Sequence, residues 1–172
     1  QIFCQWAKSL GCTIIGTVGS NEKVDIARSN GCDYVINYTK EDFAEKVLSI
    51  THGKGVSVVY DGVGHDTLEG SIKSLKVRGT MVSFGNASGA LPEVSVPKLI
   101  QPKGLYLTRP AMHLYLGTRD ELLTGAKVLF EKIESGSVKI EIFKRYKLDD
   151  VITAHQDLEN RKILGPAVII PN

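Results

Sequence analysis

The sequence predicts an α/β fold built on a doubly wound parallel sheet. Strands alternate with helices at least four times before residue 90, and the connections between them are short and rich in glycine. The strands are continuous apolar runs, most clearly VSVVYDGV at 56–63. Such runs are typical of strands that are buried on both faces, as in a parallel sheet covered by helices. Right-handed crossovers then wind the sheet in both directions from its first strand.

The first elements follow from apolar spacing and from glycines at their ends. Ile2, Trp6 and Leu10 have helical spacing, and Gly11 ends that helix. β-Branched runs bounded by Gly, Ser or Asn predict the strands, and amphipathic stretches predict the helices between them. We expect strands at 12–18, 33–37, 56–63 and 78–85, and helices at 1–10, 21–30, 39–53 and 65–76.

The pattern changes after residue 90. Residues 91–104 hold three prolines and predict an irregular connection. Beyond it we expect strands at 104–110, 139–148 and 165–170, and helices at 119–135 and 149–162. This last part does not resemble repeated strand–helix–strand units. We therefore place a domain boundary near residue 111, between a domain at 1–111 and a segment at 112–172.

Composition excludes several classes of protein. The 172 residues are 42% hydrophobic and 23% charged, which is typical of a globular protein and not of a disordered chain or a coiled coil. A net charge of +2 argues against a dedicated nucleic-acid or membrane-surface binder. The three cysteines, without C-x-x-C spacing, predict neither a disulfide framework nor a zinc site and fit a cytoplasmic protein. The sequence starts inside an expected helix, so we expect the protein to begin before Gln1.

The first candidate site follows the strand at 12–18. A fold that binds NAD places Asp or Glu at this strand end to accept hydrogen bonds from the ribose 2′-hydroxyl. Here the strand ends in Gly19 and Ser20, and Lys23 follows on the next helix. A hydroxyl and an ammonium suit a 2′-phosphate, which favours NADP over NAD. Glu22 argues the other way, and a turn serine beside a solvated helix lysine is the competing interpretation.

Two more strand ends carry candidate ligand contacts. Asp61-Gly62-Val63-Gly64 follows one buried strand, and Ser83-Phe84-Gly85-Asn86 follows the next. Glycines at a strand end let the backbone approach a flat ligand, and the Asn86 amide can hydrogen-bond a carboxamide. Ordinary turns explain both segments equally well. None of the four histidines stands four residues from another, and no H-E-x-x-H motif occurs, so we expect no metal site. Because no G-x-S-x-G or P-loop motif occurs either, we assign no hydrolase or kinase activity.

Four segments together resemble a known family: GTVGSNEKVDIARSNGCDYVINY, VVYDGVGHDTLEGSIKSLKVRGTMVSFGNASG, GLYLTRPAMHLY and LENRKILGPAVIIP. They resemble NADPH:quinone oxidoreductase, in the zeta-crystallin-like branch of the medium-chain, alcohol dehydrogenase-like reductases. The resemblance covers nearly all of the chain. It implies a Rossmann-type nucleotide-binding domain that lacks its first strand and glycine loop, followed by a C-terminal segment of the GroES-like catalytic domain.

The resemblance also implies an activity and a site. The full-length enzyme would pass a hydride from NADPH to a quinone or an α,β-unsaturated carbonyl without zinc, as a homodimer joined through the sheet edge at 104–108. No catalytic side chain is assigned. The implied cofactor-binding residues are Gly19, Ser20, Lys23 and Tyr38 around the 2′-phosphate, Val63, Phe84, Gly85 and Asn86 around the nicotinamide, and Arg161 near the C-terminus.

Two alternatives stay open at this stage. Some zeta-crystallin-like proteins resemble lens proteins or binders of AU-rich RNA, although the near-neutral charge and the lack of an Arg-rich or aromatic stripe weaken RNA binding here. The other alternative is a fragment that folds without activity. The glycine loop that binds the pyrophosphate is missing from these 172 residues, so we expect the chain by itself to be inactive.

Overall fold

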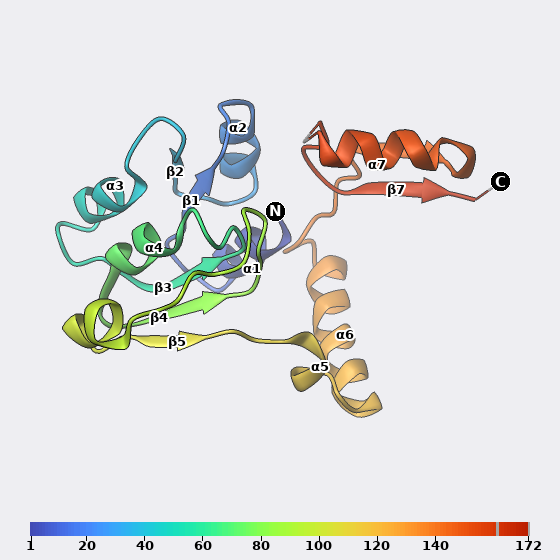
Figure 1. Ribbon diagram of the computed structural model, residues 1–172. Helices are drawn as coiled ribbons and strands as arrows, with labels where there is room; N and C mark the ends of the chain where they lie inside the picture. The colour runs from blue at the N-terminus through green and yellow to red at the C-terminus, as the bar shows by residue number, and fades with distance from the viewer. Residues whose placement is uncertain (161, 172) are drawn as a thin grey trace. The chain divides into compact units, whose positions relative to one another are not determined.

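The computed structural model describes residues 1–160 and 162–171 (Figure 1). The chain divides into two compact units. The first unit comprises Gln1–Val35 and the chain from Lys127 onward, and the second comprises Ile36–Ala126. No helix in the described ranges is long and apolar enough to cross a membrane. The domain boundary that we place near residue 111 stays a prediction.

Helices and strands alternate along the chain, as the sequence predicts. The order begins α1 (Ile2–Ser9), β1 (Ile15–Val18), α2 (Glu22–Ser29), β2 (Tyr34–Asn37), α3 (Phe43–Ile50), β3 (Val56–Asp61), α4 (Leu68–Ser74) and β4 (Leu75–Ser83). A π-helical turn (Val96–Ile100) and a 3-10 turn (Gln101–Lys103) occupy the proline-rich connection. Then follow β5 (Tyr106–Thr108), α5 (Met112–Tyr115), α6 (Arg119–Glu134), β6 (Lys144–Lys147), a 3-10 turn (Leu148–Asp150), α7 (Val151–Glu159) and β7 (Ala167–Ile170).

The second unit is built on a sheet with the strand order β3-β4-β5. Both strand pairs are parallel, and all three arrows in Figure 1 point the same way. Helix α4 packs on β3 and β4. Its apolar face meets the sheet in a core that joins strand and helix residues: Leu68, Ile72, Leu75, Met81 and Leu105. Parallel pairing places the ends of β3 and β4 side by side, with Asp61 opposite Ser83.

The strands of this sheet are less buried than their apolar runs predict. Val59 packs against the core, but Val58 and Tyr60 on the opposite face of β3 are 41% and 51% exposed. All three residues of β5 are exposed. The prediction of strands buried on both faces is therefore wrong for this chain, because its described residues leave that face of β3 open. An α/β fold with parallel strands is confirmed, and one continuous doubly wound sheet stays a prediction.

The first unit contains a strand–helix–strand unit that the sequence analysis missed. β6 and β7 pair in parallel, and α7 connects them and runs alongside β7 in Figure 1. The expectation that the last third lacks such a unit is therefore wrong. The strand expected at 139–148 is shorter than predicted, because β6 comprises only the four residues Lys144–Lys147. The same unit holds α1, β1 and α2, and β1 pairs with β2.

Candidate functional site

Two loops at the carboxyl end of the second unit's sheet touch each other through their backbones. One follows β3 at 61–67 and the other follows β4 at 83–89. The Phe84 N–H donates to the Asp61 carbonyl oxygen at 2.9 Å, and the Ser88 N–H donates to the Val63 carbonyl oxygen at 2.8 Å. A Cβ on Gly85 would lie 2.3 Å from the carbonyl oxygen of Gly62. Glycine at position 85 is therefore required for the loops to meet.

The Asp61 carboxylate fixes the shape of the first loop. Asp61 is buried, and its Oδ1 accepts the N–H groups of Val63 and Gly64 at 2.9 and 3.0 Å. The Thr67 hydroxyl approaches both carboxylate oxygens, and the Ser71 hydroxyl donates to Oδ2 at 2.7 Å. These bonds satisfy a buried charge and bend the chain from β3 into α4. Asp61 therefore holds the loop and faces away from solvent.

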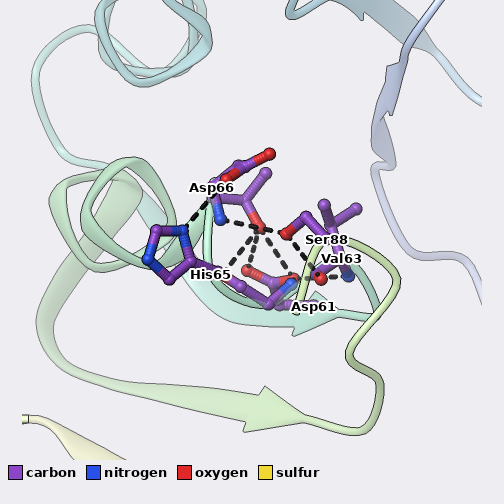
Figure 2. A network of polar contacts seen from close by, with 7 residues as sticks. Asp61, Val63, His65, Asp66 and Ser88 are labelled. Carbon is purple, nitrogen blue, oxygen red and sulfur yellow. Dashed lines mark hydrogen bonds and ion pairs between the residues drawn. The ribbon is translucent and has the colours of Figure 1, made fainter. Parts of the chain in front are cut away.

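Ser88 ties the second loop to the first (Figure 2). Its hydroxyl donates to the Val63 carbonyl oxygen at 2.9 Å and accepts the Asp66 N–H at 3.0 Å. The Asp66 carboxylate, at the surface, pairs with the His65 ring at 3.0 Å. The two loops therefore share one hydrogen-bond network, and Val63 lies at its centre.

Arg109, just after β5, reaches the same end of the sheet. Its guanidinium donates to the buried Ser83 hydroxyl and to the Asn86 Oδ1, both at 3.0 Å. Because a guanidinium can only donate, the Asn86 oxygen must face Arg109 and the Asn86 NH₂ group is left to donate elsewhere. The Phe84 ring lies over Gly62, where an added Cβ would come within 3.0 Å of it, and the ring is 58% exposed.

These groups together suit a flat polar ligand. The loops present an exposed aromatic ring, the half-buried Val63 and Gly85, and the exposed amide of Asn86. Phe84, Gly85 and Asn86 are consecutive residues of the loop at 83–89. The structure thus brings together four of the predicted site residues: Val63, Phe84, Gly85 and Asn86.

Gly19, Ser20 and Tyr38 also directly follow strands, and Lys23 lies in the first turn of the next helix. In the first unit, Gly19 and the half-buried Ser20 follow β1, and Lys23 is the second residue of α2. The Lys23 N–H donates to the Ser20 carbonyl oxygen at 3.3 Å. The Lys23 ammonium pairs with no carboxylate among the residues that the structure describes. In the second unit, Tyr38 directly follows β2 and is half-buried. Arg161 lies outside the described residues.

Two features of the site escaped the sequence analysis. Arg109 occurs in the sequence only within the segment GLYLTRPAMHLY, and Asp61 only as the first residue of the segment Asp61–Gly64, so the sequence pattern assigns neither of them a role. A usable signal existed for Arg109: neighbouring parallel strands end at the same edge of a sheet, so a residue just after β5 reaches the end of β4. Within the described ranges, no group of three or more His, Cys, Asp or Glu side chains is placed to hold a metal ion.

Comparison with known proteins gives a consistent family. Residues 1–121 match the family model described as zinc-binding dehydrogenase. The chain is 46% identical to quinone oxidoreductase 1 of Escherichia coli over 99% of this chain and 53% of that protein. It is 40% identical to a 2-haloacrylate reductase of a Burkholderia species, over 99% of this chain and 52% of that protein. The chain thus spans about half the length of these curated relatives.

A solved structure gives the same result for the fold. The Escherichia coli quinone oxidoreductase complexed with NADPH superimposes with a TM-score of 0.93 at 46% identity, over 99% of this chain and 53% of that one. Sequence and structure therefore agree on one assignment. The chain belongs to the zinc-binding dehydrogenase family, in which it corresponds to the C-terminal region of the quinone oxidoreductases.

Proposed function

We propose that this chain is the greater part of the nucleotide-binding half of an NADPH-dependent oxidoreductase that reduces quinones or α,β-unsaturated carbonyl compounds. The observation that carries the proposal is the hydrogen-bonded pair of loops at 61–67 and 83–89, with the Asn86 amide oriented by Arg109. The names of the relatives support the substrate class, because quinones and 2-haloacrylates both contain an electron-poor carbon–carbon double bond that accepts a hydride.

The loop residues fit a nicotinamide in three ways. The Asn86 NH₂ group is free to donate to the carboxamide oxygen, because its oxygen is already bound by Arg109. The backbones of Gly62 and Gly85 meet so closely that a Cβ on Gly85 would lie 2.3 Å from the Gly62 carbonyl oxygen, so the two loops bring Val63, Phe84 and Asn86 together at one strand end. Phe84 and Val63 form apolar walls that exclude water from the ring. When bound, the cofactor supplies the hydride.

The chain's own contribution to the reaction is then orientation. Fixing the nicotinamide against one wall presents a single face of the ring to the acceptor and holds the reacting carbons near each other. No side chain in the loops is required to act as a general acid. The proton that follows the hydride comes from solvent or from a group outside these 172 residues.

The preference for NADPH rests on the β1–α2 connection. Ser20 offers a hydroxyl, the Lys23 ammonium pairs with no carboxylate in the described part of the chain, and no carboxylate directly follows the strand in the sequence. A dianionic 2′-phosphate is stabilised by such groups and repelled by the carboxylate that NAD-binding folds place there. Gly19 allows the backbone to pass close to the ribose, and Tyr38 offers a ring or a hydroxyl to the adenosine.

The proposed fold explains why the strands fall into separate sheets. In the strand order 3-2-1-4-5-6 of dinucleotide-binding sheets, the first strand lies between the second and the fourth. When β1 to β5 are taken as strands two to six, the pairings β1-β2 and β3-β4-β5 match the neighbours 2-3 and 4-5-6 of that order. Residues 112–172 then return to the GroES-like catalytic domain.

The homodimer is part of the same proposal. β5 is at the edge of its sheet, and its Tyr106 and Leu107 are 62% and 40% exposed. An edge strand with exposed apolar side chains invites pairing with another chain. Light scattering on the protein should give twice the chain mass. A cytoplasmic location remains a prediction from the cysteine pattern alone.

A hybrid protein tests the proposed function. The 172-residue chain, joined to the N-terminal half of the Escherichia coli quinone oxidoreductase, should oxidise NADPH in the presence of a quinone and use NADH much less well. The rate should be unchanged by a metal chelator, because the proposed step needs no zinc. A folded hybrid that binds neither cofactor contradicts the proposal, and tight RNA binding without NADPH oxidation favours the non-enzymatic alternative.

A further inference from the structure

Two cysteines far apart in the sequence face each other in the first unit. Cys4 lies in α1, and Cys32 lies 28 residues later between α2 and β2. Their sulfur atoms are 3.6 Å apart. Cys32 is only 7% exposed, whereas Cys4 is half-buried. The third cysteine, Cys12, is exposed and belongs to neither segment.

Neighbouring contacts hold the two segments together. Lys8, one turn after Cys4 on α1, forms an ion pair with Asp33, which directly follows Cys32. Gln5 donates to the Asn30 Oδ1 at 2.8 Å. These contacts join the same two segments on both sides of the sulfur pair. The sulfurs therefore stay opposed through contacts that do not involve sulfur.

The Cys32 sulfur also has little room to turn away. A Cβ on Gly16 of β1 would lie 2.6 Å from the Cys32 sulfur, so the sulfur rests directly against the backbone of that strand. Gly31, which precedes it, has a φ of 97°, where only glycine is unstrained, and an added Cβ would lie 3.3 Å from the Cys4 carbonyl oxygen. Both glycines therefore allow the close approach that points Cys32 at Cys4.

The pair is chemically asymmetric. A hydrogen bond from the Cys32 thiol lowers the pKa of Cys4 to about 6, and the same interaction raises the pKa of Cys32. The N-terminal ammonium also lowers the pKa of Cys4, and Asp33, which raises the pKa of Cys32, forms an ion pair with Lys8. The more accessible sulfur is thus the better nucleophile near pH 7, and the buried sulfur is its hydrogen-bond donor.

We propose that Cys4 and Cys32 form a thiol pair that hydroperoxides oxidise reversibly to a disulfide. The Cys4 thiolate attacks one peroxide oxygen, the O–O bond breaks, and Cys4 becomes a sulfenic acid while the other oxygen leaves as hydroxide, which takes up a proton to become water. The Cys32 sulfur then attacks the Cys4 sulfur and loses its proton. The sulfenic oxygen leaves as water. Two thiols lose two electrons and two protons, and one hydrogen peroxide becomes two waters.

The inference stands apart from the proposed function, because neither cysteine belongs to the proposed cofactor site. Its structural effect is to fasten α1 to the segment between α2 and β2. The closed loop includes β1 and the Gly19–Lys23 connection. A crosslink across such a loop restricts the unfolded chain, so the oxidised protein should melt at a higher temperature than the reduced protein.

The sequence makes the test direct, since trypsin places the three cysteines on separate peptides: 1–8, 9–23 and 29–40. The reduced chain is treated with hydrogen peroxide, quenched by alkylation and digested without reductant. We expect a loss of 2 Da in intact mass, a linked peptide pair 1–8/29–40 at least tenfold more abundant than any pair containing 9–23, and reversal by dithiothreitol. In urea this selectivity should disappear.

Three variants complete the test. Cys12→Ser should keep both the crosslink and the rise in melting temperature, whereas Cys4→Ser and Cys32→Ala should each lose both. Cys32→Ala should also move the midpoint of Cys4 alkylation upward from a pH near 6. Equal amounts of all three peptide pairs in the native protein would overturn the proposal. So would oxidation of Cys4 to sulfinic acid without a crosslink, or a crosslink that leaves the melting temperature unchanged.

Discussion

The two parts of the proposed cofactor site are built in opposite ways. In the loops at 61–67 and 83–89, polar groups hydrogen-bond to one another. Asp61 accepts hydrogen bonds from two backbone N–H groups and two hydroxyls, and the Ser88 hydroxyl joins the two loops. At 19–23, the hydrogen bonds are those of an ordinary helix start, and the Lys23 ammonium has no carboxylate partner in the described chain. The first part is therefore organised before any ligand arrives, and the second gains its charge partner only from a ligand.

The largest expected effect comes from breaking the loop contact itself. Gly85→Ala places a methyl group 2.3 Å from the Gly62 carbonyl oxygen, and backbone on both sides has to move. We expect a loss of about 3 kcal/mol in the free energy of unfolding, measured by urea denaturation. Gly125→Ala in α6 is the matched control. Its Cβ would meet only a flexible Leu116 methyl at 3.2 Å, so the protein should keep or slightly gain stability.

The second effect tests the carboxylate that shapes the first loop. Asp61→Ala leaves the part-buried Val63 N–H and the buried Gly64 N–H without an acceptor and should cost about 3 kcal/mol of unfolding free energy. Asp61→Asn keeps one acceptor oxygen and should lose roughly half as much. Asp66→Asn, on the exposed part of the same loop, should change stability by less than about 0.5 kcal/mol. Equal effects of the Asp61 and Asp66 changes would show that the buried network does not organise the loop.

The third effect concerns Lys23, in the part of the proposed cofactor site at 19–23. Lys23→Ala in the hybrid enzyme should weaken NADPH binding by about 1.5–3 kcal/mol and NADH binding much less, because only NADPH carries the 2′-phosphate. Fluorescence titration with both cofactors measures the difference. An equal loss for the two cofactors would refute the role of Lys23.

Arg109→Ala, in the part of the site formed by the loops at 61–67 and 83–89, should weaken the binding of NADPH and NADH equally. Arg109→Ala frees the Asn86 amide to rotate and leaves the buried Ser83 hydroxyl without its guanidinium partner. Both cofactors share the nicotinamide, so their affinities should fall together, by about 1.4 kcal/mol, which is tenfold. A selective loss of NADPH in this variant would place Arg109 at the phosphate instead.

The sequence predicted the order of elements better than their ends. Helix 39–53 begins only at Phe43, because the Asp42 carboxylate accepts the Ala44 and Glu45 N–H groups and caps α3. Asp42 and Glu45 have the spacing of a capping box, so this boundary was available in the sequence. The expected helix at 65–76 is shorter for a reason that was not available: Thr67 is engaged with Asp61, and the chain enters β4 directly from α4.

The clustering of candidate site residues was predictable where one loop supplies them and not where distant segments meet. Phe84, Gly85 and Asn86 are consecutive, so one loop brings them together. Arg109 lies 23 residues from Asn86, and Cys32 lies 28 from Cys4. No local pattern links such pairs, because their contact depends on how strands and helices pack. The exposure of Val58 and Tyr60 was unpredictable for a related reason: an apolar run does not reveal which segment covers it.

The smallest effect lies away from the proposed site, in the strand–helix–strand unit of β6, α7 and β7. Hydrogen bonds from the Lys144 ammonium and the Tyr146 hydroxyl lower the pKa of the Asp157 carboxyl to about 2, below its ordinary value of 3.8. A carboxyl whose pKa is lower in the folded state stabilises the fold fully above the unfolded pKa. It loses that contribution as the pH falls toward 2. Asp157→Asn should therefore flatten the dependence of stability on pH between about 4 and 2, measured by urea denaturation at each pH. The Gly85→Ala protein, which perturbs only the loop contact, should keep the wild-type dependence of unfolding free energy on pH in that range. If it did not, the loss of stability in acid would arise in the loops at 61–67 and 83–89. The contrast between the two parts of the proposed cofactor site would then have to include their charge.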